Sequence, residues 1–476
     1  MVVHESDCSS STEPHSAQEK SITPNIQESV DSHDIYNRFS PGRKVVITIV
    51  LVWSLFQTTL SSTAVVTAIP EVGATFHTTD STVALSNALM VLCQMTGPML
   101  YAPIANTFGR RPILLTANAL LAAFSLGTGL APNLPAYFIL RFLTAPQVTA
   151  IQVVGAVVIG DIYPPTARGR ALGWLMVSTT VAPGLAPLLG GVVVTYTLWR
   201  VIFWAQTGMA VLSVLLLAVF LPETIHEKKT QLFTGLSPSG KVMQFIRLMN
   251  PSEIFTLLLS SRSLLINGMS VASLHWNQFS ILTPIRQVLN PLFHLTSPLQ
   301  AALFYLAPCG GYLTGTLCGG QLSDWVVRRY MRRRGRRVPE DRLNTVVAAV
   351  GIAMPVCALV YGWAVQEAVG GIPLVVIALY IQSVCHVAAF VSLNVYCVDV
   401  MEGTGKSALA VAGSYMVRNA AGAVGTASCL PAIDAIGVGW FMTISAGFLA
   451  VAGSFLWLAT RYGEGWRMQK TAKEGK

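Results

Sequence analysis

The sequence predicts an all-α polytopic membrane protein with twelve transmembrane helices in two pseudo-symmetric six-helix bundles. Composition is the first observation: charged residues make up only 11% of the 476 residues, against roughly 25% in soluble proteins, and hydrophobic residues make up 53%. Apolar runs long enough to cross a bilayer are the second, and an internal repeat is the third. Backbone polar groups must pair within the chain in lipid, so each run is expected to be helical.

Twelve apolar runs follow a polar N-terminal segment that lacks the pattern of a signal peptide. They cover residues 45–67, 82–104, 112–131, 135–160, 170–194, 201–221, 264–285, 299–322, 344–366, 373–397, 407–431 and 438–460. Each has about the 20 residues that span a ~30 Å hydrocarbon core. We therefore expect a disordered cytosolic tail over 1–44, a bundle over 45–221, a cytosolic linker over 222–263, a second bundle over 264–460 and a cytosolic tail over 461–476.

The placement of Lys and Arg predicts the orientation in the membrane. An even number of spans puts both ends on one side, and the loops on that side, with the tails, hold 27 of the 31 bases. The opposite loops hold only Arg200 and Arg286. Because cytoplasmic loops are enriched in Lys and Arg, both termini are predicted to be cytoplasmic. The net charge of +9 gives no reason to expect a nucleic-acid partner, because the bases lie between apolar runs and form no face of a folded domain.

The two halves of the chain repeat each other. A shift of 218 residues aligns Gly97 with Gly315, Ala105 with Ser323, Arg110 with Arg328 and Arg111 with Arg329. Both sets lie at the cytoplasmic end of the second span of their half. Parallel six-span repeats are typical of transporters that alternate access by rocking one bundle against the other.

Several motifs resemble those of the major facilitator superfamily. Residues 102–111 read APIANTFGRR where the superfamily has G-x-L-A-D-R-x-G-R-R, so the Gly-Arg-Arg end is intact and Asn106 replaces the usual Asp. In the second half, residues 320–324 (GQLSD) keep the first part and Arg328-Arg329 the last. Residues 221–224 (LPET) also resemble the superfamily. The resemblance covers about residues 45–460 and implies the major facilitator fold.

The fifth span resembles a narrower group. Residues 182–191 read APGLAPLLGG and are similar to the antiporter pattern G-x-x-x-G-P-x-x-G-G, with Pro187, Gly190 and Gly191 matching and Ala186 in place of a Gly. Together with residues 339–343 (PEDRL) and 394–399 (NVYCVD), this resembles the twelve-span drug:proton antiporter family in its fungal quinidine-resistance-like branch. Small residues let helices approach closely, so Pro187, Gly190 and Gly191 are expected to seal the two halves.

The loop after the second span is a candidate gate. Gly109 permits a tight turn, and Arg110 can pair with a carboxylate at a neighbouring helix end such as Asp161. Gating residues are therefore predicted at Gly109, Arg110, Arg111 and Asp161, and at Asp324 and Arg328 in the second half. The alternative is that Arg110 and Arg111 only anchor the topology.

Charged and polar side chains inside the spans are the candidates for substrate binding. Charge is costly in the bilayer, which singles out Arg141, Arg418, His275 and His386. The polar residues Gln57, Asn277, Gln278 and Gln382 complete the predicted set. No Asp or Glu lies near the middle of any predicted span, so this inventory favours an anionic substrate. The alternatives are a structural role for Arg141 and neutral, packed states for the two His residues.

These observations predict a secondary active transporter that exports a small organic acid or acidic metabolite by alternating access, with proton coupling. The alternative is a broad-specificity drug:proton antiporter; uptake is disfavoured by the antiporter-like fifth span. The eight His residues form no metal motif and no phosphate-binding loop occurs, so we expect no enzyme activity, cofactor or metal. The expected partners are the small molecule, a proton and the lipid bilayer, and the protein is expected to be a monomer in the plasma membrane, with the vacuolar membrane as alternative.

Overall fold

The computed structural model describes residues 36, 38–225, 237, 239–240, 243, 252–335, 338–401 and 407–474. Within those residues every regular element is a helix. The predicted disorder of the N-terminal tail concerns residues that lie almost entirely outside the described ranges, as do most of the residues of the predicted linker.

Six spans form the first bundle. They are α2 (Pro41–Thr63) continued by η1 (Ala64–Ala68) and α3 (Ile69–Thr75), α4 (Asp80–Cys93) with α5 (Thr96–Phe108), α6 (Arg110–Gly129), α7 (Leu134–Ile162), α8 (Pro165–Tyr196) and α9 (Arg200–Phe220). The first helix starts four residues before the predicted bundle boundary, because Ser40 caps it by accepting a hydrogen bond from the backbone N–H of Arg43.

The second half of the chain begins with a short helix that lies within the predicted linker. Its elements are α11 (Ser252–Ser260), α12 (Arg262–Leu282), α13 (Ile285–Leu292), α14 (Pro298–Leu303), α15 (Leu306–Arg334), η3 (Pro339–Arg342), α16 (Leu343–Ala348), the π-helical turn η4 (Ala349–Ala353), α17 (Met354–Gln366), α18 (Gly371–Val400) and α19 (Ser407–Glu474). Part of the predicted linker is therefore helical, as is the predicted C-terminal tail through Glu474.

The prediction of twelve spans is confirmed. Ten helical segments of the described chain are long and apolar enough to cross a membrane, and α11 with α12 passes as a pair bent by 105°. The last segment contains two spans, because Gly437 breaks α19 with a φ of 82°. Glycine is required there, since other residues rarely adopt a positive φ.

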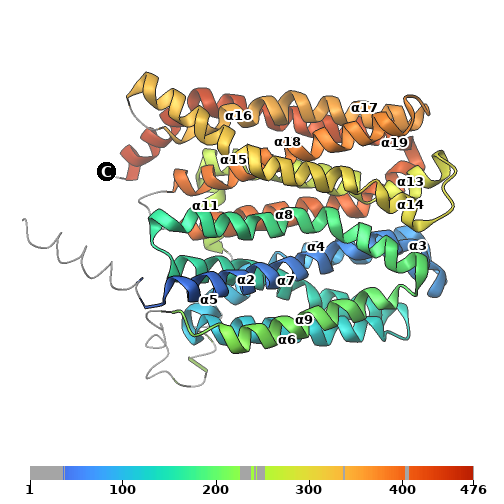
Figure 1. Ribbon diagram of the computed structural model, residues 1–476. Coiled ribbons are helices and arrows are strands. Elements are labelled where there is room, and N and C mark those ends of the chain that lie inside the picture. Colours follow the sequence, from blue (N-terminus) through green and yellow to red (C-terminus); the bar gives the residue numbers. More distant parts are fainter. Residues whose placement is uncertain are drawn as a thin grey trace, which may run out of the picture.

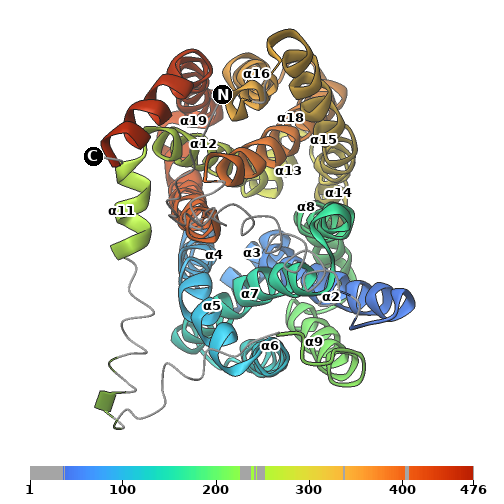
Figure 2. The same ribbon diagram turned by 90° about the vertical axis from the view of Figure 1, so that its left-hand side faces the viewer.

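The spans run side by side along one axis (Figure 1). The start of α2 and the end of α19 lie at the same end of the molecule, which we name the terminal face; Figure 2 looks onto it. The other end, where α3, α13 and α14 lie, is the opposite face (Figure 1).

The two halves meet mainly toward the opposite face. The part of α19 before Gly437, where Gly422 faces Val91, packs along α4, the part of the second span that is nearer the opposite face; α19 contacts α5 far less. Helix α8 packs against α14 and α15 of the other bundle. Leu430 of α19 is buried among apolar side chains of the first bundle, Ile69 and Val72 included. The molecule is therefore closed between its halves at the opposite face.

Candidate functional site

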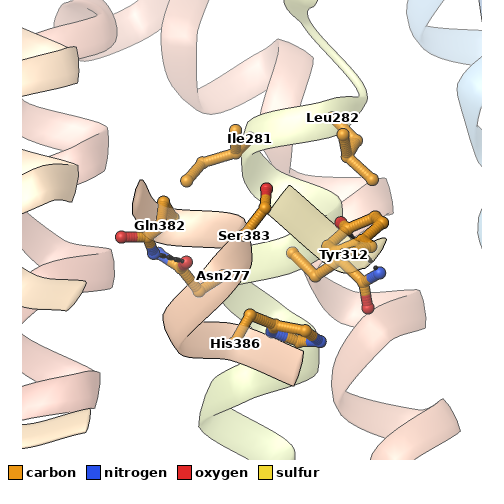
Figure 3. A pocket seen from close by; sticks show the side chains of 8 residues that line it. Asn277, Ile281, Leu282, Tyr312, Gln382, Ser383 and His386 are labelled. Atoms are coloured by element: carbon orange, nitrogen blue, oxygen red, sulfur yellow. Dashed lines mark hydrogen bonds between the residues drawn. The ribbon is translucent and has the colours of Figure 1, made fainter. Parts of the chain in front are cut away.

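One polar cluster lies inside the second bundle. Asn277 of α12 faces Gln382 of α18, with His386 of α18 and Tyr312 of α15 beside them (Figure 3). Gln278 of α12 lines the same space. Gln382 donates a hydrogen bond to Asn277, and Gln278 Nε2 donates one of 3.1 Å to the Tyr312 hydroxyl. The cavity among them has a volume of about 10 Å³, which is the room for about one water molecule. In this state it is too small for a metabolite.

Three of the predicted substrate residues surround a single aromatic ring, Phe390. The rings of His275 and His386 lie 5.3 and 6.4 Å from it, and 5.5 Å from each other. The guanidinium of Arg418 lies 5.4 Å from the same ring and 4.1 Å from the ring of Tyr415. Cations are attracted to aromatic faces at these distances, so the Arg418 charge is held by neutral π-systems.

Arg141 lies inside the first bundle and is only 2% exposed. Its guanidinium donates to the side-chain oxygen of Asn87 and lies 3.2 Å from the sulfur of Met90. The rings of Tyr137 and Phe203 are each 5.7 Å away. Each of these partners is neutral, and within the described residues Arg141 makes no ion pair. The space beside it is too small for a water molecule.

The predicted substrate residues form two separate groups rather than one. Gln57 donates a 3.1 Å hydrogen bond to Asn118, so it lies among residues of the first bundle, as Arg141 does. His275, Asn277, Gln278, Gln382, His386 and Arg418 belong to the second bundle. Within the described residues no direct contact joins the two groups. Their role in substrate binding stays a prediction.

The predicted gate residues of the first half form a charged network at the terminal face. The Nε of Arg110 donates to Asp161 at 3.1 Å, and its Nη1 donates to Asn106 at 2.6 Å. The expected Arg110–Asp161 ion pair is therefore present. With Asn106, this pair joins the ends of the second, third and fourth spans, so the network lies within one bundle. Its function as a latch stays a prediction.

Glu223 completes this network, and its role was not deduced from the sequence. Its carboxylate accepts a 2.8 Å hydrogen bond from the backbone N–H of Arg110 and further bonds from the N–H groups of Thr224 and Ile225. Gly109 has a φ of 115°, and a side chain there would collide with the Glu223 carboxylate. The available signal was the acidic residue in the motif that closes the sixth span.

Arg111 binds another element of the same half. Its Nη2 donates a 2.7 Å hydrogen bond to the backbone oxygen of Ala218 near the end of α9. Carbonyls in the last turn of a helix lack intrahelical partners and carry partial negative charge, so a cation is stabilising there. Arg111 therefore does more than add a positive charge to the loop.

In the second half the equivalent of Arg110 is Arg342, and not Arg328 as the sequence repeat predicted. Arg342 is 8% exposed and donates 3.0 and 3.1 Å hydrogen bonds to Asp324 and Ser323; its Nε also lies 3.5 Å from Asp399. Arg328 is exposed and reaches only the backbone oxygen of Asp324, at 3.3 Å. The reason is that α15 continues to Arg334, so the next span starts later than a fixed shift of 218 residues assumes.

Arg342→Gln is expected to lower the free energy of unfolding by about 3 kcal/mol, because it removes a buried guanidinium from beside two carboxylates, those of Asp324 and of Asp399, the latter 10% exposed. Arg328→Gln is the matched control and should change it by less than about 0.5 kcal/mol, as surface substitutions usually do. Thermal unfolding of the purified protein in detergent measures both. Equal effects of the two substitutions would contradict the assignment of Arg342.

The glycines of the fifth span face different helices. A side chain at Gly184 would lie 2.7 Å from the backbone of Cys309, and one at Gly191 would meet Ala302, both in the other half. The expectation that Gly190 seals the halves is wrong: it faces the backbone oxygen of Ala64 in the first span of its own bundle. Pro187 lies between them inside α8. Adjacent helix positions differ by about 100°, which is why Gly190 and Gly191 face different partners.

Fungal transporters are similar to this chain along most of its length. One is the MFS-type transporter tstD of Talaromyces stipitatus, 25% identical over 93% of this chain and 86% of the relative. Another is the MFS antiporter QDR3 of Candida albicans, 23% identical over 90% of this chain and 79% of the relative.

Solved structures share the fold. The human organic anion transporter MFSD10 superposes with a TM-score of 0.61 at 15% identity, covering 88% of this chain and all of that one. A D-xylose-proton symporter superposes with a TM-score of 0.64 at 16% identity, covering 87% of this chain and 97% of that one. At these identities the likeness concerns the fold alone.

A sequence profile described as Major Facilitator Superfamily matches residues 51–426, which reach from the first span into the eleventh. The match agrees with the twelve helices in two halves and with the similarity to fungal transporters. The chain is a multi-pass membrane transporter and not an enzyme, and it belongs to the major facilitator superfamily.

Proposed function

We propose that this protein is a secondary active exporter of a small organic acid or acidic metabolite, working by alternating access and driven by a proton gradient. The observation that carries the proposal is the pair of buried arginines, one in each bundle. Arg141 and Arg418 have only neutral partners within the described residues. A substrate carboxylate would compensate the buried charge and gain a two-point hydrogen bond with the guanidinium.

The orientation is compatible with export. We propose that the terminal face is cytoplasmic, because 27 of the 31 Lys and Arg belong to that side in the predicted topology. The halves are packed together toward the opposite face. In this orientation the described state is closed to the outside, as an exporter must be when it loads its substrate from the cytosol.

Two routes are open to the coupling proton. His275 and His386 lie 5.5 Å apart and share the ring of Phe390 with Arg418, so a proton on either ring would repel the Arg418 guanidinium. A proton can also travel on the substrate itself, since a carboxylic acid binds one reversibly. The first route predicts that replacing both His residues uncouples export from the proton gradient; the second predicts that it does not.

Export of drugs is the second candidate function. It is favoured by the antiporter-like residues of the fifth span, of which Gly191 packs against the other half. The Candida albicans relative is named an antiporter, which supports exchange transport without identifying a substrate.

Comparative metabolite profiling tests the two functions. Cells with and without the gene are compared for acids in medium and cytosol, and for efflux of the fluorescent lipophilic cation rhodamine 6G. We expect an organic acid to accumulate in the cells that lack the gene, and a protonophore to abolish the difference. Unchanged acids with lost rhodamine efflux would replace this proposal by the drug exporter.

A further inference from the structure

The opposite face contains a partly buried ion pair that joins the two halves. Nη1 and Nη2 of Arg286 donate hydrogen bonds of 2.6 and 2.5 Å to the two carboxylate oxygens of Glu71. Glu71 lies in α3, at the end of the first span, and Arg286 lies in α13, directly after the seventh. These are the corresponding spans of the two bundles, so a two-point charged contact connects the halves where they close.

Arg286 holds the first span at two places. Besides the Glu71 carboxylate, its Nη1 donates to the backbone oxygen of Thr67. Thr67 lies in η1, the 3₁₀ segment that interrupts the α-helical first span before α3. Such a segment inside a long helix often marks a hinge, because its hydrogen-bond geometry is poorer than that of the α-helix. Arg286 therefore binds both the 3₁₀ segment itself and the helix that follows it.

The surroundings make this contact stronger than an ordinary surface ion pair. The side chain of Arg286 is 10% exposed and that of Glu71 is 30% exposed. Bidentate pairs between Arg and a carboxylate are among the strongest hydrogen-bonded contacts in proteins, and partial burial reduces their screening. In contrast, the other base predicted for this side, Arg200, contacts Trp199 and the backbone oxygen of Ala131 within its own half.

We propose that Glu71 and Arg286 are the latch that holds the opposite face closed, and that the pair must separate in every transport cycle. The inference rests on the proposed orientation only in placing this face outside the cell; it does not depend on the substrate. Because the latch is present in the closed state and absent in the open one, its removal shifts the population toward the open state.

Thiol labelling measures that population. Leu430 is 5% exposed and buried between the halves near the latch, so a cysteine there reacts only when this face opens. The starting variant carries Leu430→Cys and Cys318→Ser, the latter because Cys318 is exposed. Intact cells are treated with a membrane-impermeant maleimide, and the same protein without Leu430→Cys gives the background.

Arg286→Gln and Glu71→Gln should each raise the labelling rate about tenfold, which corresponds to the loss of one charge-assisted contact. The matched control is Arg200→Gln, which removes a positive charge from the same face without touching the interface and should change the rate less than about twofold. The double reversal Glu71→Arg with Arg286→Glu should restore most of the protection, which separates the loss of a latch from misfolding.

The labelling results test the latch and the membrane orientation separately. Faster labelling of the Arg286→Gln and Glu71→Gln variants in intact cells supports both. Faster labelling only after the cells are permeabilised supports the latch and shows that this face is cytoplasmic. Unchanged labelling in both preparations, or the same increase in the Arg200→Gln control, would overturn the latch.

Discussion

Asn87→Asp should reduce export of the acidic substrate at least about tenfold while the protein remains in the membrane. Asn87 accepts a hydrogen bond from the guanidinium of Arg141, and aspartate has nearly the same shape but carries a negative charge. It would supply the carboxylate that the substrate is proposed to bring. One charge-assisted pair is worth about 1.5–3 kcal/mol, and 1.4 kcal/mol is a tenfold change.

The matched substitution in the other bundle is Asn419→Asp. The side-chain oxygen of Asn419 lies 3.5 Å from the Nε of Arg418, so an aspartate there neutralises the second candidate arginine instead. Efflux of the acid identified by profiling is measured for both variants, together with surface abundance and thermal stability. The variant that loses efflux with unchanged abundance identifies the arginine that binds the substrate.

Direct substitution of Arg141 completes this test. Arg141→Lys keeps the charge but loses the planar fork that holds a carboxylate at two points, so it should still be impaired, and Arg141→Gln should be at least as poor. The anion hypothesis fails if the Arg141 variants and both aspartate variants all export the acid at the parental rate. Increased rhodamine 6G efflux in Asn87→Asp would instead favour the drug exporter, since a buried negative charge attracts a lipophilic cation.

The spans and their grouping into two bundles could be predicted from the sequence, because the thickness of the hydrocarbon core fixes the length of an apolar helix. The ends of the helices were harder to predict. Helix α15 continues to Arg334 through a charged stretch, where hydrophobicity gives no signal, and the arginine that meets Asp324 and Asp399 is therefore Arg342 and not the predicted gate residue Arg328.

The candidate site was predicted at the level of residue types but not of contacts. Burial of Arg141 and Arg418 within spans follows from hydrophobicity, yet their location in two separate groups depends on which face of each helix packs inward. The pair Glu71–Arg286 joins residues 215 positions apart, on segments outside the predicted spans, so no local pattern could reveal it. Tertiary packing decides such contacts.

The last prediction concerns the closure of the two halves along α8. Gly184→Leu and Gly191→Leu should each lower export at least about tenfold, because a leucine at either position would collide with α14 or α15 and prevent the halves from meeting. Gly190→Leu should act differently: it meets the first span of its own bundle, so it should lower abundance and thermal stability of the protein itself.

Gly173→Leu is the control within the same helix, since a Cβ there would meet no atom within 4 Å. The four variants are compared for efflux per molecule at the cell surface and for labelling of Leu430→Cys from outside. Gly184→Leu and Gly191→Leu should combine low efflux with fast labelling at normal abundance, whereas Gly173→Leu should match the parent in every measurement. The Cβ of a leucine at position 184 would lie 2.7 Å from the Cys309 backbone, which prevents the two helices from packing as closely as they do in this structure. Normal efflux per molecule in Gly184→Leu would therefore contradict closure along α8.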